Sequence, residues 1–149
     1  MSALRTHSVR PLLALSLGAF GVSGLVTAGT ASLEPTTLET TLGAALAVVG
    51  VYGVACYARR VSRPTLARLS IGLWLAFIAI AGLHLPGLEA TGAALPASTG
   101  GVVAGFTALT WATLVGAAST TTFLAFQEYN AGTDAIPAEE SVVEQDYDY

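Results

Sequence analysis

Four long runs of apolar residues, separated by short polar segments, dominate the pattern along the chain. Each run approaches or exceeds the roughly 20 helical residues that span a hydrocarbon core about 30 Å thick. The alternating strands of about ten residues that a transmembrane barrel needs do not occur in them. Because backbone groups in lipid must be satisfied within their own segment, the runs predict helices over approximately 12–31, 42–58, 66–85 and 101–126.

These runs predict an all-α membrane protein in which four transmembrane helices form a compact bundle with short loops. Residues 1–127 would constitute this transmembrane domain. Residues 128–149 are acidic and, towards their end, low in apolar content, which predicts a mobile cytoplasmic tail. Within the predicted spans the sequence has no Asp, Glu, Lys or Asn, and Arg68 lies near the start of its span.

The composition supports a membrane protein and excludes several other classes. Of 149 residues, 53% are apolar and 11% are charged, against roughly 25% charged residues in an average soluble domain. These proportions exclude a disordered chain, a nucleic-acid-binding protein and an ordinary water-soluble enzyme. The single cysteine excludes an intrachain disulfide and a metal site made of cysteines alone. The lipid bilayer is therefore an expected partner, and nucleic acid is not.

The positive charges predict the orientation of the helices. All are arginines, and they precede the first predicted helix or fill the link between the second and the third: Arg5, Arg10, Arg59, Arg60, Arg63 and Arg68. The other two links carry only acidic charges. Because arginine-rich loops stay in the cytoplasm, we expect a multi-pass protein of the cell membrane with both termini inside. The link over residues 59–68 could also hold anionic lipid headgroups, at about 1 kcal/mol per arginine.

One alternative concerns the first apolar run. Arg5 and Arg10, the run over residues 12–26 and the small residues 27–31 resemble a cleavable signal peptide. Its removal would leave three helices and an external N-terminus. The apolar run continues almost to Leu33, which is longer than a typical signal core, so we predict a retained helix.

The unequal distribution of charge suggests the kind of cell. The chain has no lysine, is rich in Ala, Gly, Thr and Val, and carries seven of its ten acidic residues after residue 127. This composition resembles that of a membrane protein from an extremely halophilic archaeon. In concentrated salt the Debye length falls to about 3 Å or less, so closely spaced carboxylates repel one another only weakly.

A face of small residues is the most informative pattern in the fourth predicted helix. Small side chains let another helix approach closely, and the resulting van der Waals contact is a main source of cohesion between helices in lipid. The face either packs within one bundle or docks a second copy or another subunit. Its residues follow four-residue steps with an added GxxxG spacing: Gly101, Ala104, Gly105, Ala108, Ala112 and Gly116.

Three threonines on the same helix allow a second interpretation. Thr107, Thr110 and Thr113 recur every three residues. Their hydroxyls either bond back to carbonyls of their own helix or line a polar path for a solute. A proton-coupled exporter would also need a membrane-embedded acid, which the predicted spans lack.

We predict no metal, cofactor or catalytic residue. His84 and the other histidine, His7, fall on opposite sides of the membrane in the predicted topology, so they cannot share a haem or a metal ion. General acid–base catalysis needs a positioned titratable group beyond His84, and a thiol–disulfide enzyme needs a second cysteine near Cys56. An enzyme is therefore not expected.

Two functions remain. We expect a non-catalytic accessory or structural subunit that packs through small-residue helix faces against a larger membrane complex or against itself. The alternative is an oligomeric channel or transporter for a small neutral solute, acting through the threonines. The short links, the lack of intramembrane acids and the small-residue faces favour the first function.

Overall fold

Four long helices dominate the computed structural model, which describes residues 9–29, 37–87, 90 and 99–133. Each helix is long and apolar enough to cross a membrane, as the hydropathy pattern predicts. The described part of the chain is therefore all-helical and of the multi-pass membrane type. The helices are α2 (Arg10–Gly29), α3 (Thr37–Ala58), α4 (Arg63–Gly82) and α6 (Thr99–Thr133).

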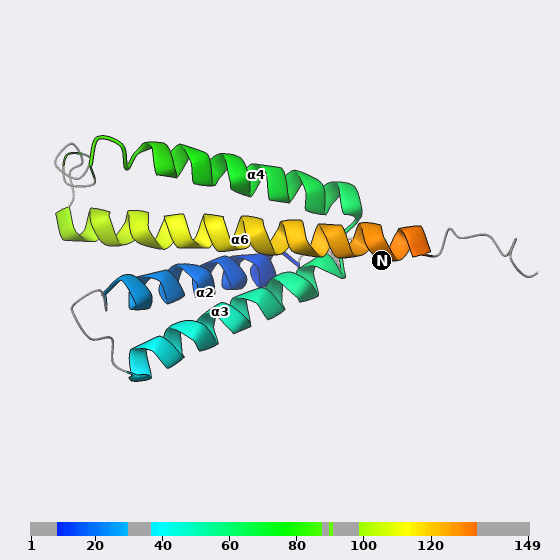
Figure 1. The fold of residues 1–149 in the computed structure, drawn as a ribbon, viewed down its shortest axis with the longest axis horizontal. Coiled ribbons are helices and arrows are strands. Elements are labelled where there is room, and N and C mark those ends of the chain that lie inside the picture. Colours follow the sequence, from blue (N-terminus) through cyan, green and yellow to red (C-terminus); the bar gives the residue numbers. More distant parts are fainter. Residues whose placement is uncertain (1–8, 30–36, 88–89, 91–98, 134–149) are drawn as a thin grey trace, which may run out of the picture.

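Helix α6 occupies the centre of the arrangement (Figure 1). It packs against α2 on one side and α4 on the other, while α3 packs along α2. Contact between α3 and α6 is much sparser, because α3 diverges from α6 towards its own N-terminal end (Figure 1). Helix α6 thus joins α4 to the α2–α3 pair.

The bounds of α4 differ from the predicted span because hydropathy does not mark where a helix begins or ends. The helix begins at Arg63, ahead of the predicted residue 66. Ser62 before it is extended, and Pro64 stands in the first turn, where its missing N–H costs no hydrogen bond. The helix ends at Gly82, ahead of the predicted residue 85, and turns follow. Pro86 disfavours a helical conformation at the residue before it.

Helices α3 and α6 are longer than predicted. Helix α3 begins at Thr37 and carries Glu39 in its first turn, where a carboxylate is favoured by the helix dipole. Helix α6 continues to Thr133, so residues 128–133, which we assigned to the tail, are helical. Glu128 ends an apolar run but leaves the helix intact, since Glu is a good helix former. The rest of the predicted tail, residues 134–149, lies outside the described residues.

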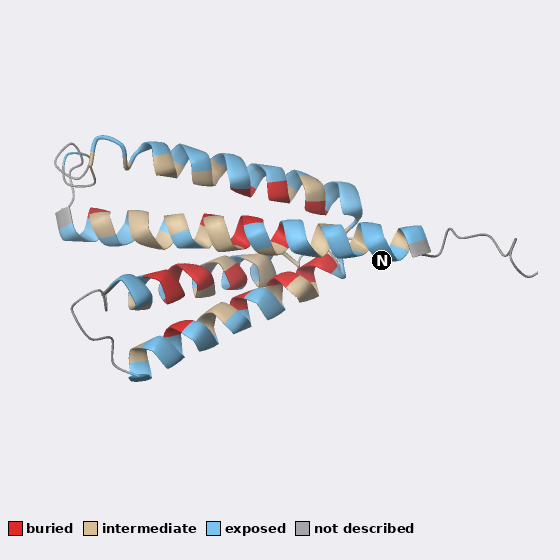
Figure 2. Cartoon of the chain, viewed as in Figure 1, coloured by how far each residue is buried: buried red, intermediate tan, exposed pale blue. Residues whose placement is uncertain are grey.

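Most of the helix surface is exposed (Figure 2). Between 17% and 28% of the most apolar window of each helix is buried. Large apolar side chains point outwards, among them Leu15, Val48 and Ile71. Continuous exposed apolar surface of this extent is unfavourable in water and fits contact with lipid chains.

The buried contacts place a large side chain of one helix on a glycine of the next. A Cβ added at Gly50 of α3 would overlap the ring of Phe20, which is 1% exposed. A Cβ at Gly24 of α2 would likewise overlap Trp111 of α6. The glycines are therefore required for the distances at which α2 meets both α3 and α6.

Candidate functional site

The small residues of α6 lie in two different environments, and the half nearer the C-terminus packs inside the molecule. A Cβ added at Gly21 of α2 would lie 3.3 Å from the carbonyl oxygen of Ala108. A Cβ added at Gly116 would lie 2.7 Å from Leu17 of the same helix α2. Ala112, between them, is half-buried. This half of the predicted face therefore serves the contact between α2 and α6.

The half nearer the N-terminus of α6 is exposed. Gly101, Ala104 and Gly105 are all exposed, and we call these three residues the outer small-residue face. A Cβ added at Gly105 would have no neighbouring atom within 4 Å. The small residues that are evenly spaced in the sequence therefore have two different surroundings, because α2 crosses α6 over only one half of the face.

The three threonines of the proposed polar path bond to their own helix. Each hydroxyl donates to the carbonyl four residues earlier, at 2.9, 2.7 and 2.7 Å for Thr107, Thr110 and Thr113. Thr113 is buried and the other two are half-buried. Hydroxyls bonded in this way need no further partner, so the helix itself accounts for them.

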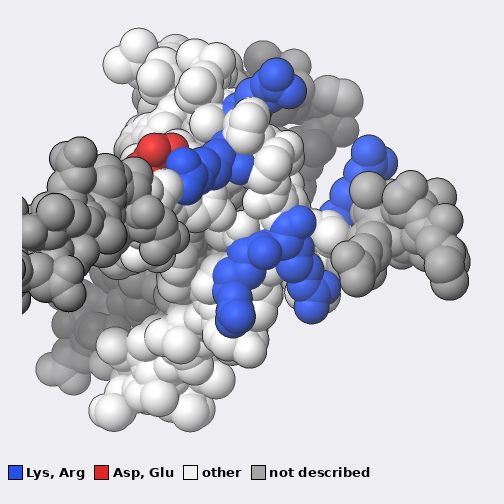
Figure 3. Space-filling view, turned by 90° about the vertical axis from the view of Figure 1, so that its right-hand side faces the viewer, with Lys and Arg blue, Asp and Glu red and all other residues white. Residues whose placement is uncertain are grey.

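The described arginines gather at one end of the molecule (Figure 3). The N-terminal end of α2 and the C-terminal ends of α3 and α6 meet there. One arginine, Arg63, approaches Glu128 of α6, with 3.8 Å between Nη1 and Oε2, and both side chains are largely exposed. Such an exposed pair contributes little to stability. The residues of this arginine end are Arg10, Arg59, Arg60, Arg63 and Arg68.

Helices α4 and α6 share a polar contact that the sequence pattern does not predict. Trp74 donates its indole N–H to the hydroxyl of Thr121 at 3.1 Å, and Ser70 lies 2.7 Å from the same oxygen. Thr121 donates its only hydroxyl proton to the Ala117 carbonyl at 2.8 Å, so Ser70 is the donor in its bond. The local pattern around Ser70 and Trp74 does not indicate this contact, because a serine in a helix can bond to a carbonyl of its own helix.

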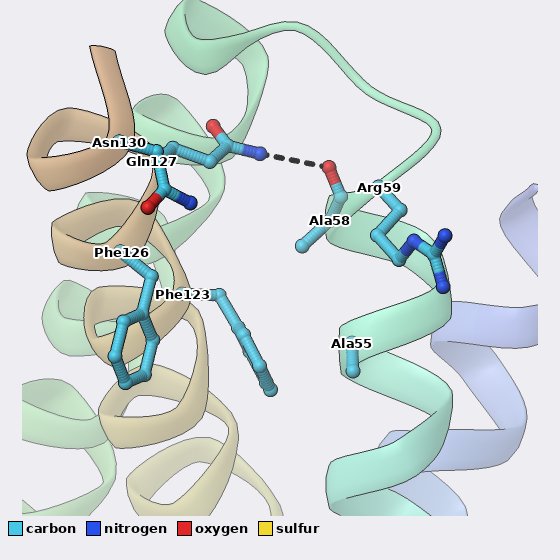
Figure 4. Close-up of a pocket in the computed structure, with 7 residues that line it drawn as sticks. All are labelled: Ala55, Ala58, Arg59, Phe123, Phe126, Gln127 and Asn130. Carbon is cyan, nitrogen blue, oxygen red and sulfur yellow. Dashed lines mark hydrogen bonds between the residues drawn. The ribbon is translucent and has the colours of Figure 1, made fainter. Parts of the chain in front are cut away.

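A pocket of about 300 Å³ opens between the C-terminal parts of α3 and α6 (Figure 4). The Gln127 side chain closes one end, because its Nε2 donates to the Ala58 carbonyl at 2.9 Å. This bond satisfies one of the carbonyls that a helix leaves unpaired at its C-terminus. The sequence pattern does not predict this pocket. Its lining is mostly apolar, with three polar residues towards the arginine end: Ala55, Ala58, Arg59, Phe123, Phe126, Gln127 and Asn130.

His84 and Cys56 lie apart from this pocket. His84 follows the end of α4, where a ring nitrogen lies 2.9 Å from the Ile80 carbonyl and the ring meets Phe106 edge-on. His84 is therefore held by a hydrogen bond to the last turn of α4. Cys56 is half-buried near the end of α3. Among the described residues, no three His, Cys, Asp or Glu side chains are grouped so that they could hold a metal ion.

The described helices define the class of the protein, and comparisons with known proteins add no family. Their length and apolar surface are those of a multi-pass helical membrane protein. Comparisons with protein-family models, with curated proteins and with solved structures found no match to this chain.

Proposed function

We propose that the protein is a non-catalytic accessory or structural subunit of the cell membrane. It docks a helix of a larger membrane complex, or of a second copy, on the outer small-residue face of Gly101, Ala104 and Gly105. The observation that carries the proposal is the open space at Gly105. The next turns of the same helix, from Ala108 to Gly116, are already in close contact with α2.

The physical argument concerns how closely helices approach in lipid. Lipid chains are as apolar as leucine side chains, so helices associate there through tight backbone contact and hydrogen bonds. At Ala108 and Gly116, α6 makes such contact within the chain. The outer face repeats the same small residues one and two turns earlier, where no described helix covers Gly105. A partner helix there would gain the same kind of contact.

The alternative, an oligomeric channel or transporter for a small neutral solute, receives less support. A path through Thr107, Thr110 and Thr113 would use hydroxyls that already donate to carbonyls of α6. A solute could use only their remaining acceptor capacity. The alternative becomes the better proposal if threonine replacement abolishes solute flux.

We further propose that both termini lie in the cytoplasm and that the four helices pack as a bundle in the membrane. The arginine end supports this orientation, since arginine-rich segments remain on the cytoplasmic side. The lysine-free composition and the acidic residues after residue 127 suit a halophilic archaeon. In its salt-rich cytoplasm the carboxylates would repel one another weakly.

The test is a tagged pull-down of the full chain from native membranes, in mild detergent and high salt, followed by mass measurement of the intact assembly. Ala104→Leu and Gly105→Leu should dissociate the partner while the chain still inserts. Gly72→Leu is the matched control, because Gly72 of α4 also faces open space. A partner retained by both variants, or lost equally in the control, would overturn the proposed docking face.

A further inference from the structure

The pocket between α3 and α6 combines an apolar crevice with a polar rim at the membrane boundary. Ala55 and Ala58 form the wall on α3, and Phe123 and Phe126 form the wall on α6 (Figure 4). The small side chains on one wall leave space beside the two rings on the other. The pocket lies at the arginine end, where the apolar spans give way to charged residues.

We propose that this pocket binds one anionic membrane lipid, with a lipid chain in the crevice and the phosphate of the headgroup at the rim. The rim residues Arg59 and Asn130 would supply the donors. This lipid site is independent of the docking face on Gly101, Ala104 and Gly105, which lies near the other end of α6.

The charge at the rim favours an anionic headgroup. Arg59 lines the pocket, and no acidic residue is among the lining residues. The guanidinium of Arg59 is exposed and is turned away from Gln127 (Figure 4). Among the described residues Arg63 has an acidic neighbour in Glu128, whereas no ion pair engages Arg59. An exposed arginine side chain is long and flexible, so Arg59 can turn to a phosphate, which guanidinium groups bind through two parallel hydrogen bonds.

The crevice favours a lipid over a free phosphate ion. Phe126 is 58% exposed, and the apolar walls would gain nothing from a small hydrated anion. In the bilayer a gap between two helices must be filled, because an empty apolar cavity loses the dispersion contacts of its walls. A lipid chain fills such a gap while its headgroup remains at the level of the arginines.

The test uses the purified full chain, stripped of lipid in mild detergent and examined by native mass spectrometry. The probes are phosphatidylglycerol, phosphatidylcholine and glycerol phosphate, each added at the same concentration. Arg59→Gln removes the charge, and Ala55→Leu fills the crevice. Their matched controls are Arg63→Gln, outside the pocket, and Ala44→Leu, at an exposed position of α3.

We expect phosphatidylglycerol to be retained by the unmodified chain and by both controls. Retention of phosphatidylglycerol should fall about fivefold in Arg59→Gln, because one arginine near anionic lipid contributes about 1 kcal/mol to binding. Retention should fall further in Ala55→Leu. Equal retention of phosphatidylcholine, or equal loss in the matched controls, would overturn the site. Binding of glycerol phosphate as tightly as the lipid would identify a phosphate site instead and would also overturn it. Should Ala55→Leu fail to fold, the comparison of Arg59→Gln with Arg63→Gln decides.

Discussion

Gly24 of α2 lies against Trp111 of α6 so closely that a Cβ at position 24 would overlap the base of the indole side chain. The overlapping atoms include Cβ of Trp111, which is bonded directly to the backbone and cannot move away without a shift of α6 itself. The distance between α2 and α6 therefore depends on the missing side chain at Gly24.

Gly24→Ala should lower the free energy of unfolding by about 1–3 kcal/mol, the usual cost of overpacking. Thermal unfolding in detergent, followed by circular dichroism, measures the change. Gly18→Ala is the control on the same helix, because a Cβ there meets no atom within 4 Å. The control should be neutral or stabilising, since alanine is the better helix former by about 1 kcal/mol. Equal stability of the two variants would refute the close approach.

Thr121→Val should destabilise the contact between α4 and α6 by about 1 kcal/mol. The substitution removes the acceptor of the bonds from Ser70 and Trp74, and bonds of this kind average about 0.6 kcal/mol in membrane proteins. Thr122→Val is the control, since the Thr122 hydroxyl is exposed and bonds to the Ala118 carbonyl of its own helix. Chemical unfolding compares the two, and a loss as large in the control would contradict the prediction.

Gln127→Glu should destabilise the chain by about 1–3 kcal/mol at neutral pH. An ionised carboxylate cannot donate to the Ala58 carbonyl, which would lose its partner and face a negative charge. A protonated carboxyl group can donate, so the loss should shrink as the pH falls. Unfolding curves at neutral and acidic pH measure both effects. Asn130→Asp, in the same pocket, should lack this recovery.

Replacing Thr107, Thr110 and Thr113 together with valine should leave solute flux into reconstituted vesicles unchanged. The hydroxyls bond within α6, and valine preserves the shape of the side chain. If the unmodified chain conducts small neutral solutes and the triple variant does not, the result would support the channel alternative and contradict the accessory role.

Labelling of single cysteines should establish the orientation. In a Cys56→Ser background, Ser62→Cys lies in the exposed link between α3 and α4, and Leu85→Cys lies at an 89% exposed position beyond the other end of α4. A membrane-impermeant thiol reagent added to intact cells should label position 85 and reach position 62 only after permeabilisation. The reverse pattern would place the arginine end outside.

Hydropathy predicts the four long helices well, because the need to satisfy the backbone in lipid leaves few other structures. Hydropathy does not predict the residues at which the helices begin and end. The start of α4 depends on Pro64, and the continuation of α6 past Glu128 depends on helix propensity, neither of which changes the apolar run. The spacing of the small residues of α6 is visible in the sequence. Which of them are covered is not, because it depends on how α2 crosses α6: α2 packs on Ala108 and leaves Gly105 open.

The polar contacts between helices could not be predicted from local pattern. Ser70 and Thr121 are 51 residues apart in the sequence, and Ala58 and Gln127 are 69 apart. Serine and threonine in a helix can always bond to their own carbonyls, so their presence alone does not indicate an interhelical partner. Gln127 lies beyond the predicted end of its span, where no feature of the pattern predicts a contact with α3.

The central position of α6 has a consequence for the order in which the protein assembles. The ribosome delivers α2, α3 and α4 first, and α2 can pair with α3 as soon as both have left the insertion machinery. Helix α4 must wait, since its principal neighbour, α6, is synthesised after it. During that interval Ser70 and Trp74 lack their partner on Thr121. The newly made chain should therefore pass through a stage at which α4 is the helix most exposed to quality-control proteases.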